Sequence, residues 1–507
     1  MLWVFLAVAV VGVAGFVYLL TIPAPLERWL QGRVLQALRE HYQADVQLEN
    51  LRVTLIPGFY ATAENFVLPN RRGGDVPPLV TVKHLTVRAN LLQLLRTPVR
   101  VSSVTLDGME IKVAPKRDQH DQSPSTVPKY HTHLANFDID RVEAGGTMLY
   151  ILRKDPDAEP LLFELRKLAL RSAGVGQPMT FTAELTNPTP PGVIQTKGHF
   201  GPWNFDEPSA TPVDGNYDFQ HADLSVFPGI SGILSSQGKY TGALNNIVVD
   251  GATDVPNFQL DSGGQEVHLT TKFHAIVDGT NGNTYLQPVN AHFLHSDVST
   301  SGEVAGKPGQ KGKTITLAVD MTRARVQDVL ALAAKGTPML TGGLALKAKL
   351  LLPPGKQPVL QKMQLAGTFD VSEAKFTQPK LKDAVNGLSR RGQGKPDDTS
   401  IDNVAAEFRG DFTLRHSTIT FARLEFAAPG VGAQVKGSYE VNTGSLNFVG
   451  DVRLEATVSQ TMTGAKHVLL KPFDPMFKKH GAGTYLPVEI GGVRDHPEVK
   501  LQWKKLF

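Results

Sequence analysis

The sequence predicts a mainly β protein in which an N-terminal transmembrane helix and an amphipathic helix precede a long, repeated antiparallel β-sheet with a few short helices. Three observations support this fold class. The first residues are continuously apolar, the next follow a helical period, and from Asp45 onward apolar and polar residues alternate. The 47 glycines, the 34 prolines and a mean hydropathy of -0.13 are typical of many short strands joined by turns.

The stretch from Leu2 to Leu20 contains no charged residue, and its length matches the roughly 20 apolar residues that cross a bilayer as a helix. Trp3 and Tyr18 lie near its two ends, where amphipathic rings suit the headgroup region. We therefore expect residues 1–22 to form an uncleaved membrane anchor. A cleaved signal peptide is the alternative, but the only Ala-x-Ala site, Ala7 to Ala9, comes too early.

The charges that flank this stretch do not decide its orientation. No Lys or Arg precedes it, while Arg28, Arg33 and Arg39 follow it, which favours a C-terminus on the inside. Long domains, however, translocate largely regardless of such counts. Because the polar, β-rich remainder offers no second span of suitable length, we expect a single crossing with the body outside the cytoplasm.

Residues 23–44 predict a second helix, which Pro25 can begin. Such a helix lies on the membrane surface or caps the end of the following sheet, and capping is the commoner arrangement. The apolar residues recur at helical spacing and define one face of this helix; they are Leu26, Trp29, Leu30, Val34, Ala37, Leu38 and Tyr42.

The composition excludes several classes of function. A chain of 507 residues is expected to form several domains or one extended repeated architecture. The absence of cysteine excludes disulfides, thiolate metal sites and cysteine nucleophiles. The net charge of +4 is spread along the chain without a basic run, so we expect no nucleic-acid partner.

After Asp45 the alternation changes parity twice, which means that the apolar residues move from even-numbered to odd-numbered positions. One change falls at Glu49–Asn50 and the other between Val82 and Leu85. A change of parity moves the apolar side chains to the other face unless the strand contains an extra residue, so both sites predict β-bulges. A short helix is expected from Leu91 to Leu95.

A weak internal repeat follows. The alternating segment from Val99 recurs 38 residues later from Phe137, with one inserted residue before Met148. Each copy predicts a β unit. The polar, proline-containing stretch between the copies, Lys116 to Lys129, predicts an exposed loop.

The middle of the chain continues as strands bounded by turns. Asp-Gly and Asn-Gly pairs predict tight turns at Asp250–Gly251, Asp278–Gly279 and Asn281–Gly282. A short helix, a glycine break and a strand are expected twice, from His221 and from Arg323.

The chain then divides into regions by these patterns. A further short helix is expected from Leu381 to Leu388, and alternating strands continue to the end. After the anchor and the amphipathic helix we distinguish an N-terminal β region (45–200), central β repeats with short helices (201–400) and a C-terminal β region (401–507).

Several of these segments together resemble the AsmA family. RVTLIPGFYATAENFVLPN from Arg52, TVKHLTVRANLLQLL from Thr81 and VSSVTLDGMEIKV from Val101 resemble its N-terminal region. LPVEIGGVRDHPEVKLQW from Leu486 resembles its closing hairpin, and the central FGPWNFDEPSATPVDGNYDF is similar to some members. The resemblance implies an inner-membrane anchor, a periplasmic body and a long, curved, groove-like sheet akin to TamB and the bridge-like lipid transfer proteins. It also implies a role in outer-membrane lipid homeostasis or assembly.

A lipid groove requires a continuous dry surface, because each acyl methylene exposed to water costs roughly 0.8 kcal/mol. One face of an alternating sheet supplies such a surface. The same face can instead pack against a second sheet as a sandwich core, and the resemblance favours the groove. The candidate groove residues are Val80, Val82, Val99, Val101, Val104, Leu106, Leu486, Val488 and Ile490.

Patterns for catalysis or metal binding are weak, so we expect no enzyme, cofactor or metal site. His131 and His133 have no third ligand that the sequence can place, and the chain contains no Gly-x-Ser-x-Gly elbow. Three further patterns lack the required spacing: Asp278, Asn281 and Asn283 for a calcium loop, Asp206 with Glu207 for a glycosidase, and Gly392, Gly394 and Lys395 for a phosphate loop.

Two functions without catalysis remain. The first is a membrane-anchored periplasmic protein that carries or conducts phospholipid along an apolar β groove. The second is an envelope assembly scaffold that assists insertion of outer-membrane proteins by pairing its sheet edges with client strands. A hydrolase would instead require convergent polar groups in a closed pocket.

Overall fold

The computed structural model describes residues 47–54, 59–69, 77–90, 99–113, 137–152, 160–174, 178–202, 204, 207–306, 312–494 and 496–502. These residues are mainly β, with 25 strands in one mixed sheet and a few short helices. They form two compact units, the first mostly from residues up to Ala222 and the second mostly from Asp223 onward. Strands β12 (Ile233–Ala243) and β13 (Asn246–Leu260) contribute residues to both units.

Several expectations fall outside the described residues. These are the anchor (1–22), the amphipathic helix (23–44), the short helix from Leu91 to Leu95 and the loop from Lys116 to Lys129. Within the part of the chain that the structure describes, no helix is both long enough and apolar enough to span a bilayer.

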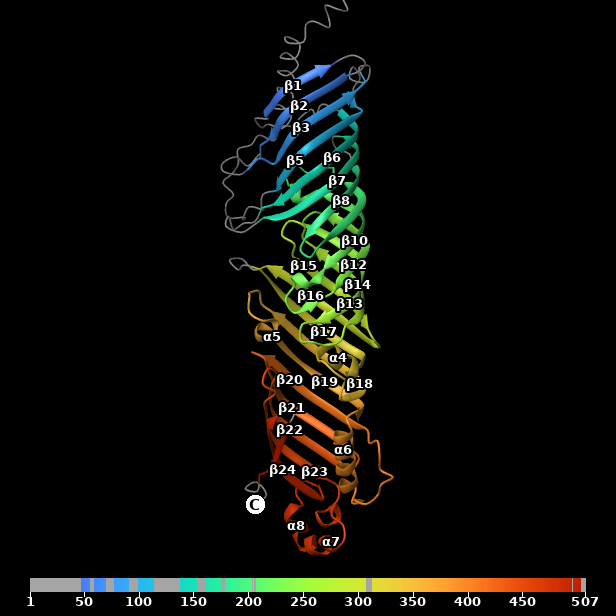
Figure 1. Cartoon of the computed structure of the whole chain (residues 1–507), viewed down its shortest axis with the longest axis vertical. Coiled ribbons are helices and arrows are strands. Elements are labelled where there is room, and N and C mark those ends of the chain that lie inside the picture. The colour runs from blue at the N-terminus through green and yellow to red at the C-terminus, as the bar shows by residue number, and fades with distance from the viewer. Residues whose placement is uncertain are drawn as a thin grey trace, which may run out of the picture. The chain divides into compact units, whose positions relative to one another are not determined.

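The first unit is a succession of neighbouring strands, coloured blue to green in Figure 1. The strands follow chain order from β1 to β10, except that the short β4 pairs with β6. The bounds are β1 Gln47–Thr54, β2 Phe59–Leu68, β3 Val80–Ala89, β4 Val99–Val101, β5 Ser103–Val113, β6 Phe137–Ile151, β7 Leu161–Gly174, β8 Met179–Pro188, β9 Pro191–Phe200 and β10 Pro212–Asp223, with one 3-10 helix at Pro208–Ala210.

Strand β6 corrects the expectation of an antiparallel sheet, because β4 and β5 both pair with it in parallel. Parallel neighbours require a long connection that returns the chain to the same end. The segment 114–136 between β5 and β6 has that length. The sheet is therefore mixed. Its parallel pairing joins the two strands that flank the long polar stretch before residue 137.

The internal repeat explains the register of the parallel pairing between β5 and β6. Val104 pairs with Val142 and Leu106 with Ala144, so equivalent positions of the two copies lie side by side. The offset is still 38 residues at the end of the pairing, where Lys112 lies opposite Tyr150. The inserted residue expected before Met148 is therefore wrong.

A residue with positive φ marks the first expected bulge, whereas the bulge expected between Val82 and Leu85 is wrong, because β3 pairs with β2 and β5 without a register shift. Asn50 has a φ of 50° at the predicted change of parity, and the β1–β2 register shifts on both sides of Glu49. The same backbone conformation occurs at Asn65 (51°), Gly108 (63°) and Gly146 (61°) on β2, β5 and β6. Asn and Gly adopt this conformation most readily, which explains their presence here.

On β3 the predicted change of parity appears as two consecutive exposed side chains, Lys83 and His84. The register of β3 with β2 and with β5 is nevertheless unbroken. The reason is that the partner strands carry their own irregular residue at the matching position, Asn65 on β2 and Gly108 on β5.

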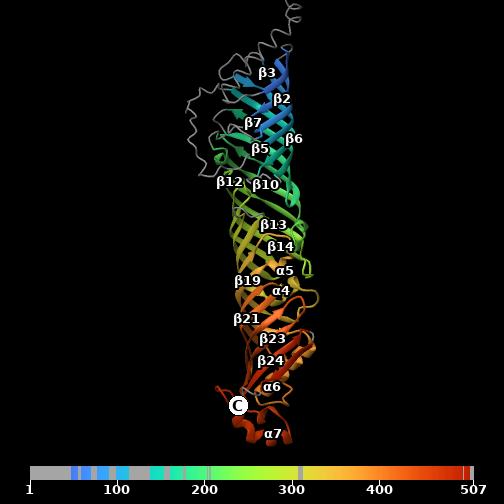
Figure 2. The same ribbon diagram turned by 90° about the vertical axis from the view of Figure 1, so that its left-hand side faces the viewer.

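The second unit combines antiparallel strands with short helices, seen in Figures 1 and 2. After the 3-10 helix η3 (Leu224–Val226) its strands are β11 Ile230–Ser231, β14 Val267–Val277, β15 Thr284–Phe293, β16 Ser296–Gly306, β17 Lys313–Arg325, β18 Leu340–Leu352, β19 Gln364–Phe376, β20 Ala406–Arg415, β21 Thr418–Ala428, β22 Val431–Glu440, β23 Leu446–Leu454, β24 Thr484–Val493 and β25 His496–Leu501. Its helices are α4 Val326–Ala333, α5 Val359–Lys362, α6 Pro379–Gly392, η4 Ser459–Thr461, α7 Ala465–Leu470, η5 Lys471–Phe473 and α8 Asp474–Phe477.

The expected short helices are confirmed at η3, α4 and α6. The turn predicted at residues 278–282 is also confirmed, because it joins β14 to β15 and Thr280 N–H donates to Asp278 Oδ1 over 2.9 Å. The turn predicted at Asp250–Gly251 is wrong. Both residues lie inside β13, and the chain turns before that strand, at Leu244–Asn245. Here the strand pattern on both sides outweighs the local preference of Asp-Gly for a turn.

A buried carboxylate fixes α4 to the turn between β15 and β16. Asp328 accepts hydrogen bonds from the backbone N–H of His295 (3.0 Å) and from Ser296 Oγ (2.8 Å). Ser296 Oγ in turn accepts from the backbone N–H of Arg325, at 2.9 Å. Asp328 and Ser296 are both buried, so this network holds α4 over the core of the unit, where Val326, Val329 and Leu332 pack.

Replacing Asp328 by alanine should destabilise the second unit by about 2 kcal/mol, because it leaves a buried hydroxyl and a backbone N–H without their acceptor. Asp328→Asn keeps one acceptor oxygen and should cost about half as much. Thermal unfolding of the two variants measures the difference. Equal unfolding temperatures for Asp328→Ala and the unchanged chain would contradict this network.

Candidate functional site

The first unit contains an apolar face that runs across its strands. Between β5 and β10 it consists of three rows of residues that lie opposite one another in the register. The rows are Val104–Val142–Leu170–Phe181–Gly198–Gly215, Leu106–Ala144–Leu168–Ala183–Thr196–Tyr217 and Thr147–Leu165–Leu185–Ile194–Phe219. Because alternate side chains of a strand point to opposite faces, these rows share one face of the sheet.

The large side chains on this face are only half-buried. Leu165, Leu168, Leu170, Phe181 and Leu185 all retain intermediate exposure, whereas the small Ala144 and Ala183 between them are buried. From Gln47 to Ala222 the described residues contain no α-helix, and their strands form a single series of neighbours. Among these residues no second layer covers the leucines, as a sandwich core would require.

The opposite face of the same strands is polar and carries ion pairs. Lys167 Nζ lies 3.9 Å from Glu184 Oε2, Arg141 Nη1 lies 3.4 Å from Glu143 Oε1, and His199 Nδ1 lies 3.0 Å from Asp214 Oδ2. Most of these groups are well exposed, so each pair adds little to stability. Their importance is that the sheet separates an apolar face from a polar, ion-paired one.

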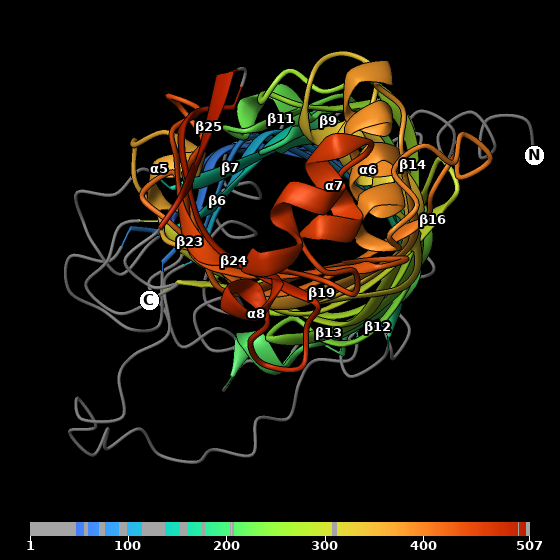
Figure 3. The same ribbon diagram turned by 90° about the horizontal axis from the view of Figure 1, so that it is seen from below.

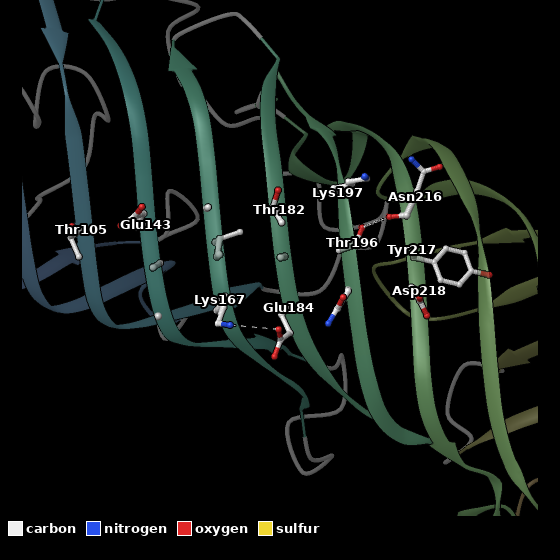
Figure 4. A pocket seen from close by; sticks show the side chains of 16 residues that line it. Thr105, Glu143, Lys167, Thr182, Glu184, Thr196, Lys197, Asn216, Tyr217 and Asp218 are labelled. Atoms are coloured by element: carbon white, nitrogen blue, oxygen red, sulfur yellow. Dashed lines mark hydrogen bonds and ion pairs between the residues drawn. The ribbon is translucent and has the colours of Figure 1, made fainter.

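A concavity of about 770 Å³ is lined mainly by this polar face, as Figure 4 shows. It lies over β5 to β10, and Lys167, Glu184, Lys197, Asn216 and Asp218 are among its lining residues. Leu168 and its row neighbours Ala144, Ala183, Thr196 and Tyr217 also line it, whereas Leu165, Leu170, Phe181 and Leu185 do not. The concavity is therefore lined by residues of the polar face together with the second row of the apolar face.

Tyr240 of β12 adds a half-buried polar contact to these strands. Its hydroxyl lies 2.6 Å from Thr196 Oγ1, and Thr196 Oγ1 also donates to the Asn216 carbonyl oxygen at 2.9 Å. Burial raises the pKa of Tyr240, and the nearby Asp214 carboxylate raises it further against the opposing effect of the Thr196 hydrogen bond. The phenol is thus a neutral structural partner at physiological pH.

The predicted groove residues divide between the two units. Val82 is buried with Met109 and Ala144, and Val80 and Leu106 pack against this cluster. Val104 begins the first row of the apolar face. Val99 and Val101 belong to β4, beside Phe137 and Ile139 of β6. The leucines of β7 and β8 were not predicted, although LLFELRKLAL carries the necessary spacing once a change of parity is allowed at Arg166–Lys167.

Leu486, Val488 and Ile490 lie on β24 of the second unit, where they continue long apolar rows. The rows are Leu317–Leu350–Leu365–Leu414–Ile419–Tyr439–Leu446, Val319–Ala348–Gly367–Phe412–Phe421–Gly437–Phe448–Ile490–Val499, Met321–Leu346–Phe369–Gly410–Leu424–Val435–Gly450–Val488–Leu501 and Ala324–Leu344–Val371–Phe408–Phe426–Ala433–Val452–Leu486. Viewed from its end, this unit has strands that curve around the position of α6 (Figure 3).

Aromatic rings fill the apolar face of the second unit. Phe369 lies 6.2 Å from both Phe412 and Phe421, measured between ring centroids, and Phe421 lies 5.9 Å from Phe448. Glycines on neighbouring strands make room for these rings. A Cβ at Gly410 would lie 2.8 Å from the ring of Phe369, closer than real Cβ atoms approach. The sequence did not predict that Phe side chains lie opposite or diagonal to Gly on neighbouring strands, because that arrangement depends on the register in which the strands pair.

The patterns weighed for catalysis have structural roles where they are described. Asp278 closes its turn by accepting from Thr280 and Asn281, and Gly392 and Gly394 lie at the end of α6. His131, His133 and Asp206 are outside the described residues. Within the described ranges no three His, Cys, Asp or Glu side chains gather as metal ligands.

Comparisons of the chain with models of protein families, with curated proteins and with solved structures find no match. The candidate site is therefore defined by its own geometry. That geometry is a mixed sheet with one apolar, half-exposed face and one ion-paired, hydrated face.

Proposed function

We propose that this chain is an AsmA-like protein, anchored in the inner membrane with its body in the periplasm, that carries phospholipid along the apolar face of its sheet. The transport serves lipid homeostasis of the outer membrane. The observation that supports this proposal is the apolar face of β5 to β10, with its large side chains half-exposed and no described layer over them.

The energetics favour an apolar ligand on this face. Covering apolar surface gains about 25 cal/mol per Å², so an acyl chain lying over Leu165, Leu168 and Leu185 stabilises the complex and is itself kept from water. Polar substrates gain nothing from such a surface. Catalysis is not part of the proposal.

The dimensions also suit an acyl chain. Neighbouring strands are about 4.8 Å apart, so a row that crosses β5 to β10 is roughly 24 Å long. One leaflet of bilayer hydrocarbon is about 15 Å thick. An extended acyl chain therefore fits within one row, and the adjacent rows accommodate a second chain of the same phospholipid.

A photoactivatable amino acid at position 168 tests this proposal in the full chain expressed in cells. The matched control is position 167, which neighbours Leu168 in sequence but points to the ion-paired face. After illumination we expect phospholipid on the chain labelled at 168 and none on the chain labelled at 167, as read by mass spectrometry. Crosslinks from position 168 to protein alone would overturn lipid carriage.

The second candidate, an envelope assembly scaffold that pairs with client strands, is favoured by one observation. All residues of β25 are exposed, including Val499 and Leu501, and among the described strands β25 pairs only with β24. An unpaired strand edge is a template for another strand. The same photoactivatable residue placed at Val499 would crosslink to outer-membrane proteins if this candidate is correct.

A further inference from the structure

Four short helical elements form one end of the second unit. The chain leaves the sheet after β23, forms η4, α7, η5 and α8, and returns as β24 (Figures 1 and 2). We call α7, η5 and α8, residues 465–477, the helical tip. Asp474 attaches the tip to η4, because its carboxylate accepts from the backbone N–H of Ser459 (2.8 Å) and from Ser459 Oγ (2.7 Å). Ser459 is buried, so the tip is a fixed part of the fold.

The helical tip exposes several large apolar side chains within a short segment. Leu469 is 70% exposed, Phe473 47% and Met476 41%, and Met462 just before the tip is 37% exposed. Single exposed apolar residues are normal on a protein surface, but a group of them marks an interaction site.

The exposed charged side chains along this segment are lysines. Lys466, Lys471 and Lys478 are exposed. The only acidic residue between Met462 and His480 is Asp474, whose carboxylate is bound to Ser459. The partner of the tip must therefore accept apolar side chains and present negative charge.

We propose that the helical tip docks on the surface of a bilayer that contains anionic phospholipid. Leu469, Phe473 and Met476 enter the boundary between headgroups and acyl chains, and the lysines lie among the phosphates. Helical segments with large apolar residues and lysines bind membranes in this way, and each lysine adds attraction to an anionic leaflet. This inference does not rest on lipid carriage by the first unit. It assigns the second unit a membrane contact of its own, separate from the expected N-terminal anchor.

The test uses the full chain held in nanodiscs of phosphatidylcholine. Because the chain has no cysteine, a single cysteine in place of Met476 can carry a polarity-sensitive fluorophore. Vesicles of phosphatidylcholine mixed with phosphatidylglycerol should shift its emission to the blue and raise its intensity several-fold. The same label at Asn447, an exposed residue on the polar face of β23, should not respond. Equal responses at the two positions, or none at position 476, would overturn the proposal.

Charge reversal separates the lipid surface from a protein partner. Lys466→Glu with Lys471→Glu should raise the vesicle concentration for half-maximal response at least about tenfold. The matched control is Lys349→Glu with Lys436→Glu, two exposed lysines on the polar face of the same unit, and its response should be unchanged. If the tip variant responds as the unchanged chain does, or if vesicles of pure phosphatidylcholine bind equally well, the tip is not an anionic-membrane surface, and a protein partner becomes the better assignment.

Discussion

Replacing Gly392 by valine is expected to destabilise the second unit by about 3 kcal/mol, because the site has no room for a side chain. A Cβ at position 392 would lie 2.4 Å from the carbonyl oxygen of Gly430 and 2.6 Å from a methyl carbon of Val431. The backbone cannot move away freely. Ser389 Oγ donates to the Pro429 carbonyl (2.8 Å) and the Ala456 N–H donates to the Gly392 carbonyl (2.9 Å), so α6 is held at this distance.

The same helix supplies the control. A Cβ at Gly387 would meet nothing within 4 Å, so Gly387→Ala should stabilise the unit by up to about 1 kcal/mol through helix propensity. Thermal unfolding, with hydrogen exchange of β22 to locate the effect, measures both variants. If Gly392→Val unfolds at the same temperature as the unchanged chain, α6 does not approach the β21–β22 turn as closely as the structure places it.

Helix α6 also shows what the sequence could and could not predict. Its existence was predictable from Leu381 to Leu388, and the structure extends it to Pro379–Gly392. A helix on a sheet normally buries its leucines, yet Leu381 and Leu388 are exposed, whereas Asn386, Ser389 and Gly392 are buried. This inverted packing depends on distant backbone groups.

Asn386 illustrates that dependence. Its Oδ1 accepts from the Val404 N–H at 3.1 Å and its Nδ2 donates to Asp402 Oδ1 at 2.6 Å. A hydrogen bond from the Asn403 backbone and the charge of Lys382 lower the pKa of Asp402, so this acceptor stays ionised well into the acidic range. Periodicity describes only the helix itself and contains no information about these partners.

Strand pairing shows a similar limit. Alternation predicted the strands of the first unit, and the change of parity at Asn50 predicted its bulge. The parallel pairing of β5 with β6 was not predicted, because alternation is the same in parallel and antiparallel strands. The 38-residue repeat was the available signal, since Val104 and Val142 are equivalent in the repeat and adjacent in the sheet.

The sequence predicted that the candidate site is an apolar face of the sheet, but it did not predict which strands carry the exposed part of that face. Alternation indicated one apolar face and named Val82 and Leu106, which the structure brings near Ala144. It could not say whether a second layer covers that face, because coverage depends on segments far away in the chain. The half-exposed leucines of β7 therefore became candidates only from the structure.

Replacing Leu168 and Leu185 together by aspartate is expected to reduce the phospholipid bound per chain more than tenfold. Each substitution places a carboxylate on the apolar face, where contact with an acyl chain removes its hydration without offering a partner. That desolvation costs several kcal/mol for a charged group, and about 1.4 kcal/mol already corresponds to a factor of ten in binding. Both leucines are half-buried, so in the unliganded protein water still reaches the carboxylates.

The control variant carries the same charges on the other face. Ala169 follows Leu168 in sequence and pairs with Thr182 on the ion-paired side. Thr180 lies two residues before Thr182 and therefore on the same side of the sheet. Ala169→Asp with Thr180→Asp places the two carboxylates diagonally on the ion-paired side, as Leu168 and Leu185 are diagonal on the apolar side, and should therefore retain phospholipid at the level of the unchanged chain. Lipid extraction and mass spectrometry of the purified full-length variants give the amounts, and circular dichroism confirms that both are folded. Equal losses of phospholipid in the two variants would show that charge anywhere on β7 and β8 disturbs binding. The apolar face of these strands would then not be the lipid-binding surface.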